Sequence, residues 1–244
     1  MGTFAGATNN WLNNTPQGLQ YQIDNGLTYI RDGLILYLDA GDSNSYPGTG
    51  NTWTDLSGND NDGTLINGPT YSSDNGGFIV FDGVDDYITV SNVQPSTNDF
   101  TISVWVYKFN NTSNDYIWDF GSNGGTLSSG TSVGGYGFRY YNETLGTSSN
   151  MYTQGTIPDI NKWYNVSITR NSGTSTMYVN GSLITSSSGD THDISSTTLY
   201  IGRYGGGTDY EHHGYISNFS IYNRALTQQE IQQNFNALKG RYGL

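Results

Sequence analysis

Acidic and amide side chains gather in two segments whose oxygens could bind a hard cation. Asp39 and Asp42 follow the first apolar run of the chain, and Asp60 and Asp62 belong to the Asn-Asp-Asn-Asp-Gly sequence at 59–63. Calcium takes six to eight oxygen ligands from carboxylates, amide carbonyls and the backbone. These residues therefore predict one structural Ca²⁺. The alternative is that they only cap turns through hydrogen bonds to the backbone.

Tyrosines at strand ends and in Gly-rich loops are candidates for binding a sugar. A pyranose ring stacks on an aromatic face while neighbouring polar side chains bind its hydroxyl groups. The chain contains 20 Tyr, and those in suitable positions are Tyr136, Tyr140, Tyr141, Tyr204 and Tyr210. They predict a glycan-binding surface, with an ordinary surface or a subunit interface as the alternative.

Composition excludes several classes of function. The chain has nine Lys and Arg against 21 Asp and Glu, and its cations are scattered singly, so it cannot bind nucleic acid by charge. It has no Cys, which excludes disulfides and thiolate metal sites. No apolar run approaches the ~20 residues that span a bilayer, and no export signal is expected at the N-terminus. We therefore expect neither nucleic-acid binding nor membrane insertion.

Short apolar runs between Gly, Asn, Ser and Asp clusters predict an all-β fold. Within 33–40, Leu34, Leu36 and Leu38 recur with the two-residue period of a strand. The same signals place two strands in 78–90 around the turn at 82–83. Further strands are expected at 100–107, 116–120, 136–141, 163–170, 174–179, 182–185, 198–204 and 215–222.

The sequence also predicts a hairpin and a closing helix. Asn180 and Gly181 join two apolar runs and both tolerate the positive φ of a type I′ turn, so 163–185 is expected to be a three-strand meander. Thr227 and Glu230 have the spacing of a capping box, and Gly240 is placed to stop the helix. We predict an amphipathic helix from 227 to 238 packed on the sheets.

Residues 1–32 differ from the rest of the chain and predict an N-terminal arm. Their apolar side chains are too sparse to offset the ~1 to 2 kcal/mol that ordering each residue costs. The arm should therefore order only against the domain or another chain, with Trp11, Leu12 and Tyr21 as anchors. The alternative is a frayed terminus. Residues 33–244 are predicted to form one domain.

Several phrases of the sequence, taken in order, resemble the laminin G-like branch of the concanavalin A-like lectin/glucanase superfamily. They are DGLILYLDA at 32–40, WTDLSGNDNDGTL at 53–65, FDGVDDYI at 81–88, WYNV at 163–166, YVNG at 178–181 and YNRALT at 222–227. The resemblance implies a jelly-roll sandwich of two antiparallel sheets, which agrees with the strand pattern. Chains that contain these sequence motifs resemble structural proteins of tailed phages.

The resemblance also bears on the predicted calcium site. Many relatives hold one structural Ca²⁺ near these loops, with an acidic pair on the strand that corresponds to 215–219. In this chain Ser217 and Asn218 stand at the positions of that pair. Asn218 is therefore expected to join the ligands, and the loss of charge should weaken the site.

Enzymatic chemistry is not expected. Glycoside hydrolysis needs two carboxyl groups that face the same bond, and the glucanases that the chain resembles carry them as Glu-x-Asp-x-x-Glu on one strand. The three Glu, at positions 143, 211 and 230, do not form this pattern. Asp85 and Asp86 are adjacent, so they would point to opposite faces of a strand. His192, His212 and His213 are expected to be solvated loop residues.

The expected function is that of a non-enzymatic virion-surface protein, either a head decoration or a fibre component. It would present a lectin-like jelly roll that binds host-surface glycans. The expected partners are other virion proteins, copies of the chain itself and a cell-surface glycan. Assembly in the host cytoplasm suits the absence of Cys and of an export signal. A secreted carbohydrate-binding module is the alternative, and the Glu positions disfavour a glycoside hydrolase.

Overall fold

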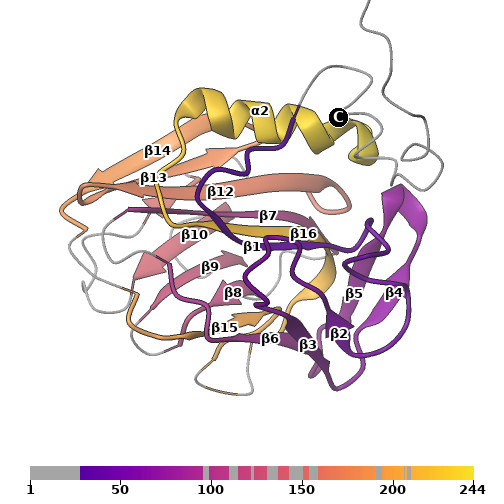
Figure 1. Ribbon diagram of the computed structural model, residues 1–244. Helices are drawn as coiled ribbons and strands as arrows, with labels where there is room; N and C mark the ends of the chain where they lie inside the picture. Colours follow the sequence, from indigo (N-terminus) through magenta and orange to yellow (C-terminus); the bar gives the residue numbers. More distant parts are fainter. Residues whose placement is uncertain are drawn as a thin grey trace, which may run out of the picture.

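The computed structural model describes residues 28–95, 99–109, 115–121, 124–130, 137–142, 151–153, 159–190, 194–205, 207 and 210–244. In this part of the chain, two antiparallel sheets face each other and a helix lies on the outer side of the first sheet (Figure 1). The predicted jelly-roll sandwich with a short C-terminal helix is confirmed.

The first sheet contains eight strands. Seven of them have the order β14 (Ser182–Ser188), β13 (Thr174–Val179), β12 (Trp163–Asn171), β7 (Phe100–Lys108), β16 (His213–Tyr222), β5 (Phe78–Asp82) and β4 (Thr70–Ser72). The eighth, β1 (Leu34–Asp39), also pairs with β16. Strand β16 accommodates both neighbours because its first residues pair with β5 and its last residues pair with β1.

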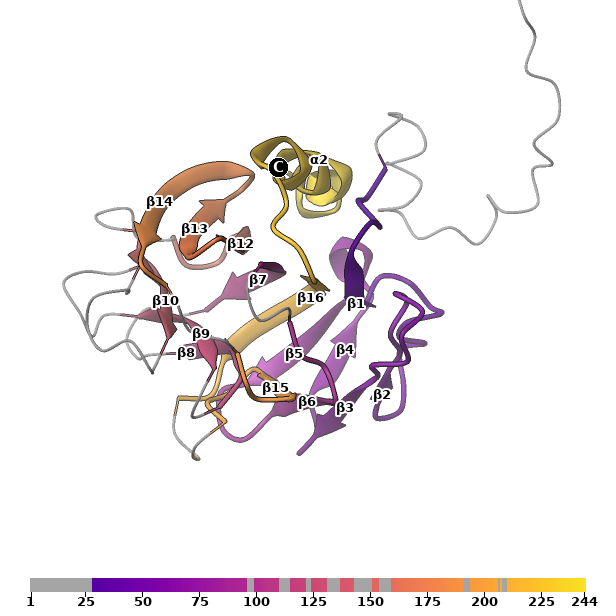
Figure 2. The same ribbon diagram turned by 60° about the vertical axis from the view of Figure 1, so that its left-hand side comes forward.

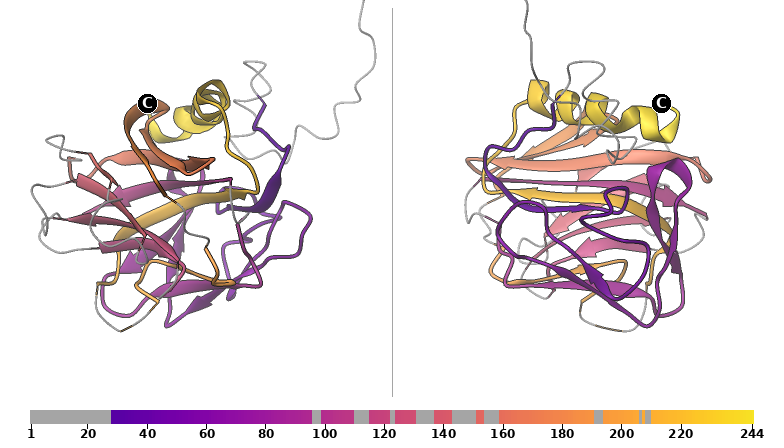
Figure 3. Two further views of the ribbon diagram at one scale, coloured as in Figure 1. Left: turned by 90° about the vertical axis from the view of Figure 1, so that its left-hand side faces the viewer. Right: turned by 45° about the vertical axis from the view of Figure 1, so that its right-hand side comes forward.

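The second sheet also contains eight strands. Their order is β11 (Met151–Tyr152), β10 (Gly137–Asn142), β9 (Gly125–Gly130), β8 (Asp115–Asp119), β15 (Thr198–Ile201), β6 (Tyr87–Ser91), β3 (Gly63–Ile66) and β2 (Thr52–Trp53). Figure 3 shows the two sheets as separate layers, with the helix above the first.

Alternating side chains fill the space between the sheets. From the first sheet, β1 contributes Leu36 and Leu38 and β7 contributes Val104, all fully buried. From the second sheet, Ile88 and Trp118 enter the same core and are fully buried as well. Because successive strand residues point to opposite faces, the two-residue period of the sequence becomes one apolar layer, whose burial drives folding.

Helix α2 (Gln228–Leu238) covers a second apolar layer on the outer face of the first sheet (Figure 2). Trp105 of β7 and Tyr222 of β16 lie in this layer with Ile231 and Leu238 of the helix. The ring of Phe235 stacks on Trp105 with a centroid distance of 5.6 Å. The predicted packing of the helix on the sheets is therefore confirmed, and Trp105 is buried beneath it.

The start of α2 has the predicted cap, whereas the chain after its end continues in a way that was not predicted. The capping box is confirmed: the Thr227 side chain accepts from the Glu230 backbone, and the Glu230 carboxylate accepts from the Thr227 backbone. The predicted end of the α-helix at Leu238 is confirmed, but Gly240 does not end the helical path of the chain. The chain continues as a 3₁₀ helix, η4 (Lys239–Tyr242), and Gly243 takes the left-handed conformation that ends it. This extra turn places Arg241 and Tyr242 in buried positions.

The predicted meander is confirmed, and so are the two strands on either side of the predicted turn at 82–83. Asn180 and Gly181 both have positive φ, and β12, β13 and β14 are neighbours in the first sheet. Strands β5 and β6, by contrast, lie in different sheets and do not pair. The turn between them carries the chain across the sandwich, held by hydrogen bonds from Asp82 N to Asp86 and from Val84 N to Asp82.

The predicted domain boundary at Gly33 is too late in the sequence. Tyr29 is buried in the layer beneath α2, and its hydroxyl lies 3.0 Å from Ser220 Oγ. The backbone N–H of Ile30 donates to Asn234 Oδ1 at 2.8 Å. The domain therefore includes Thr28–Asp32. Of the predicted arm, 1–27 lies outside the described residues.

No helix among the described residues is both long enough and apolar enough to cross a lipid bilayer.

Candidate functional site

The acidic residue at the end of β1 is paired with an arginine. Arg241 Nη1 donates to both carboxylate oxygens of Asp39, at 2.7 and 2.9 Å. Arg241 Nη2 donates to Ser217 Oγ at 3.0 Å and to the backbone carbonyls of Gly76 and Gly77. A guanidinium thus occupies a buried pocket of oxygens that would otherwise suit a metal cation. The prediction that Asp39 binds calcium is not supported by this geometry.

The other predicted calcium ligands are engaged in turns or lie apart from a shared site. Asp42 Oδ1 accepts from the backbone and side chain of Asn44, and Asp62 Oδ1 accepts from the backbone of Asp55. Asp60 takes a left-handed backbone conformation in its loop. These contacts match the alternative interpretation, that the Asp residues cap turns.

Asn218 lies opposite Asp39 in the β1–β16 pair. Its amide is buried and forms no hydrogen bond within the part of the chain that the structure describes. Because Arg241 already uses both oxygens of Asp39, the predicted set of Asp39, Asp42, Asp60, Asp62 and Asn218 does not fit one ion.

Among the described residues, one group of three acidic side chains has oxygens close enough to share a cation. It consists of Asp82, Asp85 and Asp86, whose ligand oxygens lie within 4.8 Å of one another. None of the predicted calcium residues belongs to it. Burial raises the pKa of Asp86. One carboxylate oxygen of Asp86 accepts a hydrogen bond from Asp82 N, and one of Asp82 accepts from Val84 N, so both serve the turn.

The structure separates the five tyrosines predicted to bind a glycan. Tyr140 is fully buried between the sheets, so that prediction is wrong: its ring is part of the core and contacts Trp118. Tyr141 is half-buried, and the guanidinium of Arg139 lies 5.3 Å from its ring centre. Tyr136 lies outside the described residues.

Tyr204 and Tyr210 come together on the second sheet, as predicted candidates for stacking should. Both contact Tyr116 of β8, with ring-centre distances of 5.1 and 5.6 Å. Tyr210 is 49% exposed, while Tyr116 and Tyr204 are half-buried. We call Tyr116, Tyr204 and Tyr210 the tyrosine cluster.

A buried carboxylate positions the loop that carries this cluster. Asp119 accepts hydrogen bonds from Gly205 N at 2.8 Å, Gly121 N at 2.9 Å and Thr126 Oγ1 at 2.5 Å. The Gly205 position is also sterically tight, because a Cβ there would lie 2.6 Å from the Tyr200 ring. Asp119 therefore ties the loop after β15 to β8 and β9.

The loop is also bonded to β8 at both ends. Gly202 N donates to Ile117 O at 3.0 Å, and Tyr116 N donates to Tyr210 O at 3.0 Å. Near its second end, His212 N donates to Gly202 O at 2.8 Å. These backbone bonds hold Tyr204 and Tyr210 beside Tyr116, so the cluster is part of the sheet framework.

Three neighbours extend the tyrosine cluster and were not singled out from the sequence. Tyr200 of β15 and Tyr87 of β6 have ring centres 6.5 Å apart, and the guanidinium of Arg203 lies 4.4 Å from the Tyr87 ring centre. For the two tyrosines the sequence signal is the alternation of half-buried Tyr with buried aliphatic residues along a strand, which points the Tyr side chains to the outer face of the sheet. Together these side chains offer flat ring faces and one cationic hydrogen-bond donor.

A second aromatic surface lies on the first sheet. Tyr215 of β16 stacks on Tyr107 of β7 and on Phe78 of β5, and Phe109 meets it edge-on with a centroid distance of 4.7 Å. Tyr107, Phe109 and Tyr215 are half-buried. Their positions within or directly after strands do not distinguish them, in the sequence, from aromatic residues of the core.

Two titratable groups, Glu230 and His212, are committed to the fold. Arg224 donates to both carboxylate oxygens of Glu230, which lowers the pKa of Glu230 to about 2. His212 was expected in a solvated loop, but it is fully buried, and burial lowers its pKa to about 3. His213 is half-buried, and His192 lies outside the described residues.

The fold and the tyrosine cluster define a sandwich of the lectin type that carries an aromatic surface. A family model described as the concanavalin A-like lectin/glucanases superfamily matches residues 82–232. The chain belongs to this superfamily. No curated protein sequence matches it significantly.

Solved structures with the same fold include binding domains of larger proteins. The binding domain of paraclostridial mosquitocidal protein 1 aligns with a TM-score of 0.67 at 22% identity, over 85% of this chain and 52% of that one. Botulinum neurotoxin type C, whose cell entry depends upon interaction with two ganglioside molecules, aligns with a TM-score of 0.65 at 19% identity, over 86% and 52%.

A third structure matches nearly in full. Domain 4 of a GH43 extracellular arabinanase from Geobacillus stearothermophilus, in complex with arabinotriose, aligns with a TM-score of 0.64 at 18% identity. The alignment covers 82% of this chain and 97% of that domain. The chain thus spans about half the length of the two toxin chains and almost all of the arabinanase domain. At these identities the likeness concerns the fold.

Proposed function

We propose that this chain is a non-catalytic glycan-binding domain whose ligand stacks on the tyrosine cluster. The observation that carries the proposal is the convergence of Tyr116, Tyr204 and Tyr210 on one surface through a loop anchored to Asp119. Rings held by a sheet lose little conformational freedom on binding, which favours affinity. Tyr210 is exposed, and its hydroxyl forms no hydrogen bond with another described residue, so it would supply one for a sugar hydroxyl group. The Arg203 guanidinium donates to the carbonyls of Tyr204 and Gly207 and so helps to hold the loop.

The related structures support a binding role. The arabinanase domain was solved with arabinotriose, and the cell entry of the type C neurotoxin depends upon two ganglioside molecules. Both proteins share the sandwich with this chain. Since a fold hosts many functions, the assignment to this chain depends on its own tyrosine cluster.

We further propose that the domain is displayed on a virion surface, as a head decoration or fibre component assembled in the host cytoplasm. The support is the resemblance of the six sequence phrases, at 32–40, 53–65, 81–88, 163–166, 178–181 and 222–227, to those of structural proteins of tailed phages. A chain without Cys needs no oxidising compartment to fold. Its partners would be other virion proteins or copies of itself.

A glycan array followed by titration tests the glycan proposal. We expect Tyr204→Ala and Tyr210→Ala to lose at least tenfold in affinity for the best array glycan. Tyr204→Phe and Tyr210→Phe keep the ring face and should stay within about threefold, because the stacking area is preserved. Equal binding by the Ala variants and the unmodified chain would show that the glycan, if bound, does not use the cluster.

The virion proposal is tested separately on particles. Antibodies against the folded domain should label intact purified particles in electron micrographs, and mass spectrometry of those particles should detect the chain. Detection only in the culture medium, free of particles, would support the secreted carbohydrate-binding module and overturn the virion assignment.

A further inference from the structure

Helix α2 leaves part of the outer face of the first sheet uncovered. Beside its first residue, strands β12 and β13 and the segment 225–228 enclose a cavity of about 460 Å³. Five Thr and Ser hydroxyls and the amides of Asn171 and Gln228 line it, together with Tyr178, Leu226 and Ala225. None of these ten lining residues is charged, although the whole chain carries a net charge of −12.

We propose that this cavity binds a neutral saccharide unit. It lies on the first sheet, whereas the tyrosine cluster lies on the second, so the inference concerns a separate site from that of the proposed function. A volume of about 460 Å³ falls within the range of about 300 to 1,000 Å³ that is typical of small-ligand sites.

The lining has the chemistry that a sugar requires. Thr169 and Thr176 are directly opposite each other in the β12–β13 pair, so their side chains share the face that Tyr178 also lines. The side chains of Thr174, Thr176 and Gln228 form no hydrogen bond with another described residue. They are therefore free to bind sugar hydroxyls, while Tyr178 and Leu226 offer apolar contact to the C–H face of a pyranose.

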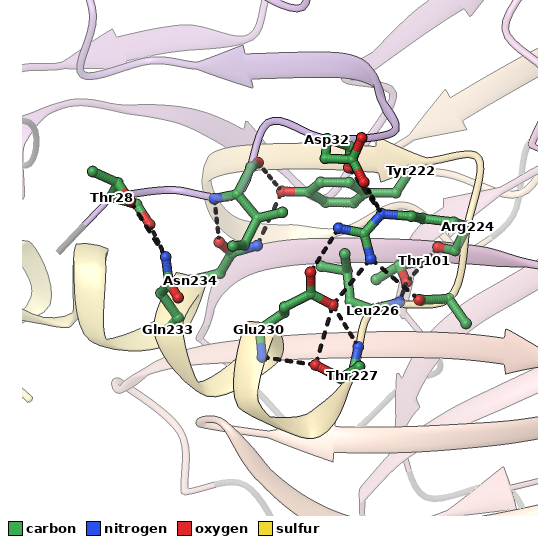
Figure 4. A network of polar contacts seen from close by, with 12 residues as sticks. Thr28, Asp32, Thr101, Tyr222, Arg224, Leu226, Thr227, Glu230, Gln233 and Asn234 are labelled. Carbon is green, nitrogen blue, oxygen red and sulfur yellow. Dashed lines mark hydrogen bonds and ion pairs between the residues drawn. The ribbon is translucent and has the colours of Figure 1, made fainter.

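The helix terminus beside the cavity is not available to an anion. The Glu230 carboxylate accepts from Thr227 N at 2.8 Å, and Thr227 Oγ1 accepts from Glu230 N at 3.3 Å. Figure 4 shows this reciprocal pair at the start of the helix. Arg224 donates to both oxygens of Glu230, at 3.0 and 2.7 Å. The N–H groups of Thr227 and Glu230 and the Arg224 cation are thus paired within the chain, and the Glu230 carboxylate supplies a negative charge at this helix end. A phosphate, sulfate or sialic acid would find a carboxylate there, so a neutral ligand fits better.

The walls of the cavity are preorganised. Thr101 Oγ1 accepts from Leu226 N at 2.8 Å and donates to Arg224 O at 3.0 Å, which fixes the segment before α2 to β7 (Figure 4). At the β12–β13 turn, Ser172 N donates to Asp99 Oδ1 at 2.7 Å. A ligand that enters this space therefore does not need to order its walls, which lowers the cost of binding.

A peptide fits the cavity less well than a sugar. Extended peptides commonly bind by adding a strand to an exposed sheet edge. The cavity lies over β12 and β13, while β14 occupies that edge of the sheet. The cavity presents side-chain hydroxyl groups, whereas strand addition by a peptide needs unpaired backbone N–H and C=O groups.

Amide NMR on the full chain tests the assignment. The probes are lactose, maltose, cellobiose and mannobiose, which are neutral, and 3′-sialyllactose, which adds an acidic sugar to lactose. We expect at least one neutral disaccharide to shift amides of 169–178 and 225–228 saturably, with a dissociation constant in the millimolar range. No saturable shift there with any of the four up to about 50 mM, or tighter binding of 3′-sialyllactose than of lactose at those amides, would overturn the inference.

Variants that fill the cavity provide the second arm. Thr176→Trp places an indole on the cavity face of β13, and Thr174→Trp does the same from an exposed position. Both should weaken the identified disaccharide at least tenfold. The control is Thr64→Trp, at an exposed threonine on the second sheet, which should bind like the unmodified chain. Melting curves confirm folding, and undiminished binding by both folded cavity variants would overturn the assignment.

The same titrations separate this inference from the proposed function. If Tyr204→Ala abolishes sugar binding and Thr176→Trp does not, the tyrosine cluster is the site and the cavity assignment fails. If Thr176→Trp abolishes binding and Tyr204→Ala does not, the cavity assignment holds and the cluster proposal fails. Independent losses at two sets of amides would support both sites.

Discussion

Arg241 and Asp39 form a buried bidentate ion pair although they lie 202 positions apart in the sequence. The pair joins the end of the first strand, β1, to the 3₁₀ turn η4 that follows the last helix. Tyr37 donates to the same carboxylate at 3.2 Å, and Tyr242 and Arg241 both bond to Ser217 Oγ. The chain therefore supplies its own cation to the carboxylate that was expected to bind calcium.

This pairing predicts that the domain is stable without calcium. A ligand that binds only the native state stabilises it by RT ln(1 + [L]/Kd), so the melting temperature rises with the logarithm of the ligand concentration once that concentration exceeds Kd. Since Asp39 is already neutralised by Arg241, the melting temperature should be the same in millimolar CaCl₂ and in chelator. Differential scanning calorimetry measures this directly. A melting temperature that falls in chelator, and falls less in Asp60→Ala or Asp62→Ala, would restore the calcium site.

Removal of the guanidinium should be costly. Arg241→Met leaves the Asp39 carboxylate buried without its partner, and breaking one side of such a pair costs about 3 to 5 kcal/mol. Arg224→Met is the matched control, because its ion pairs are part-exposed and such pairs contribute about 1 kcal/mol or less. Urea unfolding at neutral pH gives both values. Similar losses in the two variants would mean that the buried pair contributes no more than the exposed one.

Burial of His212 predicts a loss of stability in mild acid. Its pKa is about 3 in the folded chain and about 6.5 when exposed, because burial and the nearby Lys108 charge disfavour the imidazolium. Below pH 6.5 the unfolded chain binds a proton that the native chain does not, so stability falls with pH until about pH 3. Between pH 6.5 and 4.5 this amounts to roughly 2 to 3 kcal/mol.

The groups around His212 define the controls for that experiment. Asp115 Oδ2 lies 3.0 Å from Lys108 Nζ and 3.9 Å from His212 Nδ1, and His213 is the next residue in the chain. His212→Gln should flatten the pH profile of the unfolding free energy, while His213→Gln should leave its slope unchanged. NMR titration should show the His212 ring neutral at pH 5. A His212 ring that protonates near pH 6.5 would contradict this account.

The sequence predicted those parts of the fold that depend on local periodicity. The alternation in β1 and β7, the Asn180-Gly181 turn and the Thr227-Glu230 capping box each involve residues close in the chain, and each is confirmed. The β5 to β6 turn shows the limit. Its residues are turn formers in any context, and whether the next strand pairs back or crosses to the other sheet depends on distant partners such as β16 and β3.

The candidate site was harder to predict for the same reason. Tyr140 and Tyr141 are neighbours in sequence, but the pleat of β10 places the first in the core and leaves the second half-buried. Tyr116 joins Tyr204 and Tyr210 only because β8 pairs with β15. No local signal marks Arg241 as the partner of Asp39, because the contact forms only when both ends of the chain have packed on β16.

Two truncations should define where the domain begins. The first, which removes residues 1–27, retains Tyr29, whose buried ring packs on Tyr37 at a centroid distance of 5.0 Å. It should keep the unfolding free energy within about 0.5 kcal/mol, as expected for an arm that serves docking and not the fold of the domain. The second, which removes residues 1–32, also deletes Tyr29 and the hydrogen bonds of Ile30 to Asn234 and Tyr222. It should lose about 3 kcal/mol or more, the cost of emptying a buried aromatic position.

The first truncation also tests the predicted docking arm. It should remove the docking of the chain without changing the stability of the domain, whereas the second truncation changes both. If Trp11, Leu12 and Tyr21 anchor the chain to a particle or to another copy, removal of residues 1–27 should abolish incorporation while urea unfolding remains unchanged. Sedimentation with purified particles, or analytical ultracentrifugation of the chain alone, measures the incorporation. Normal assembly of the first truncation would place the docking surface on the sandwich. A large loss of stability in the first truncation would instead show that residues before Thr28 belong to the domain.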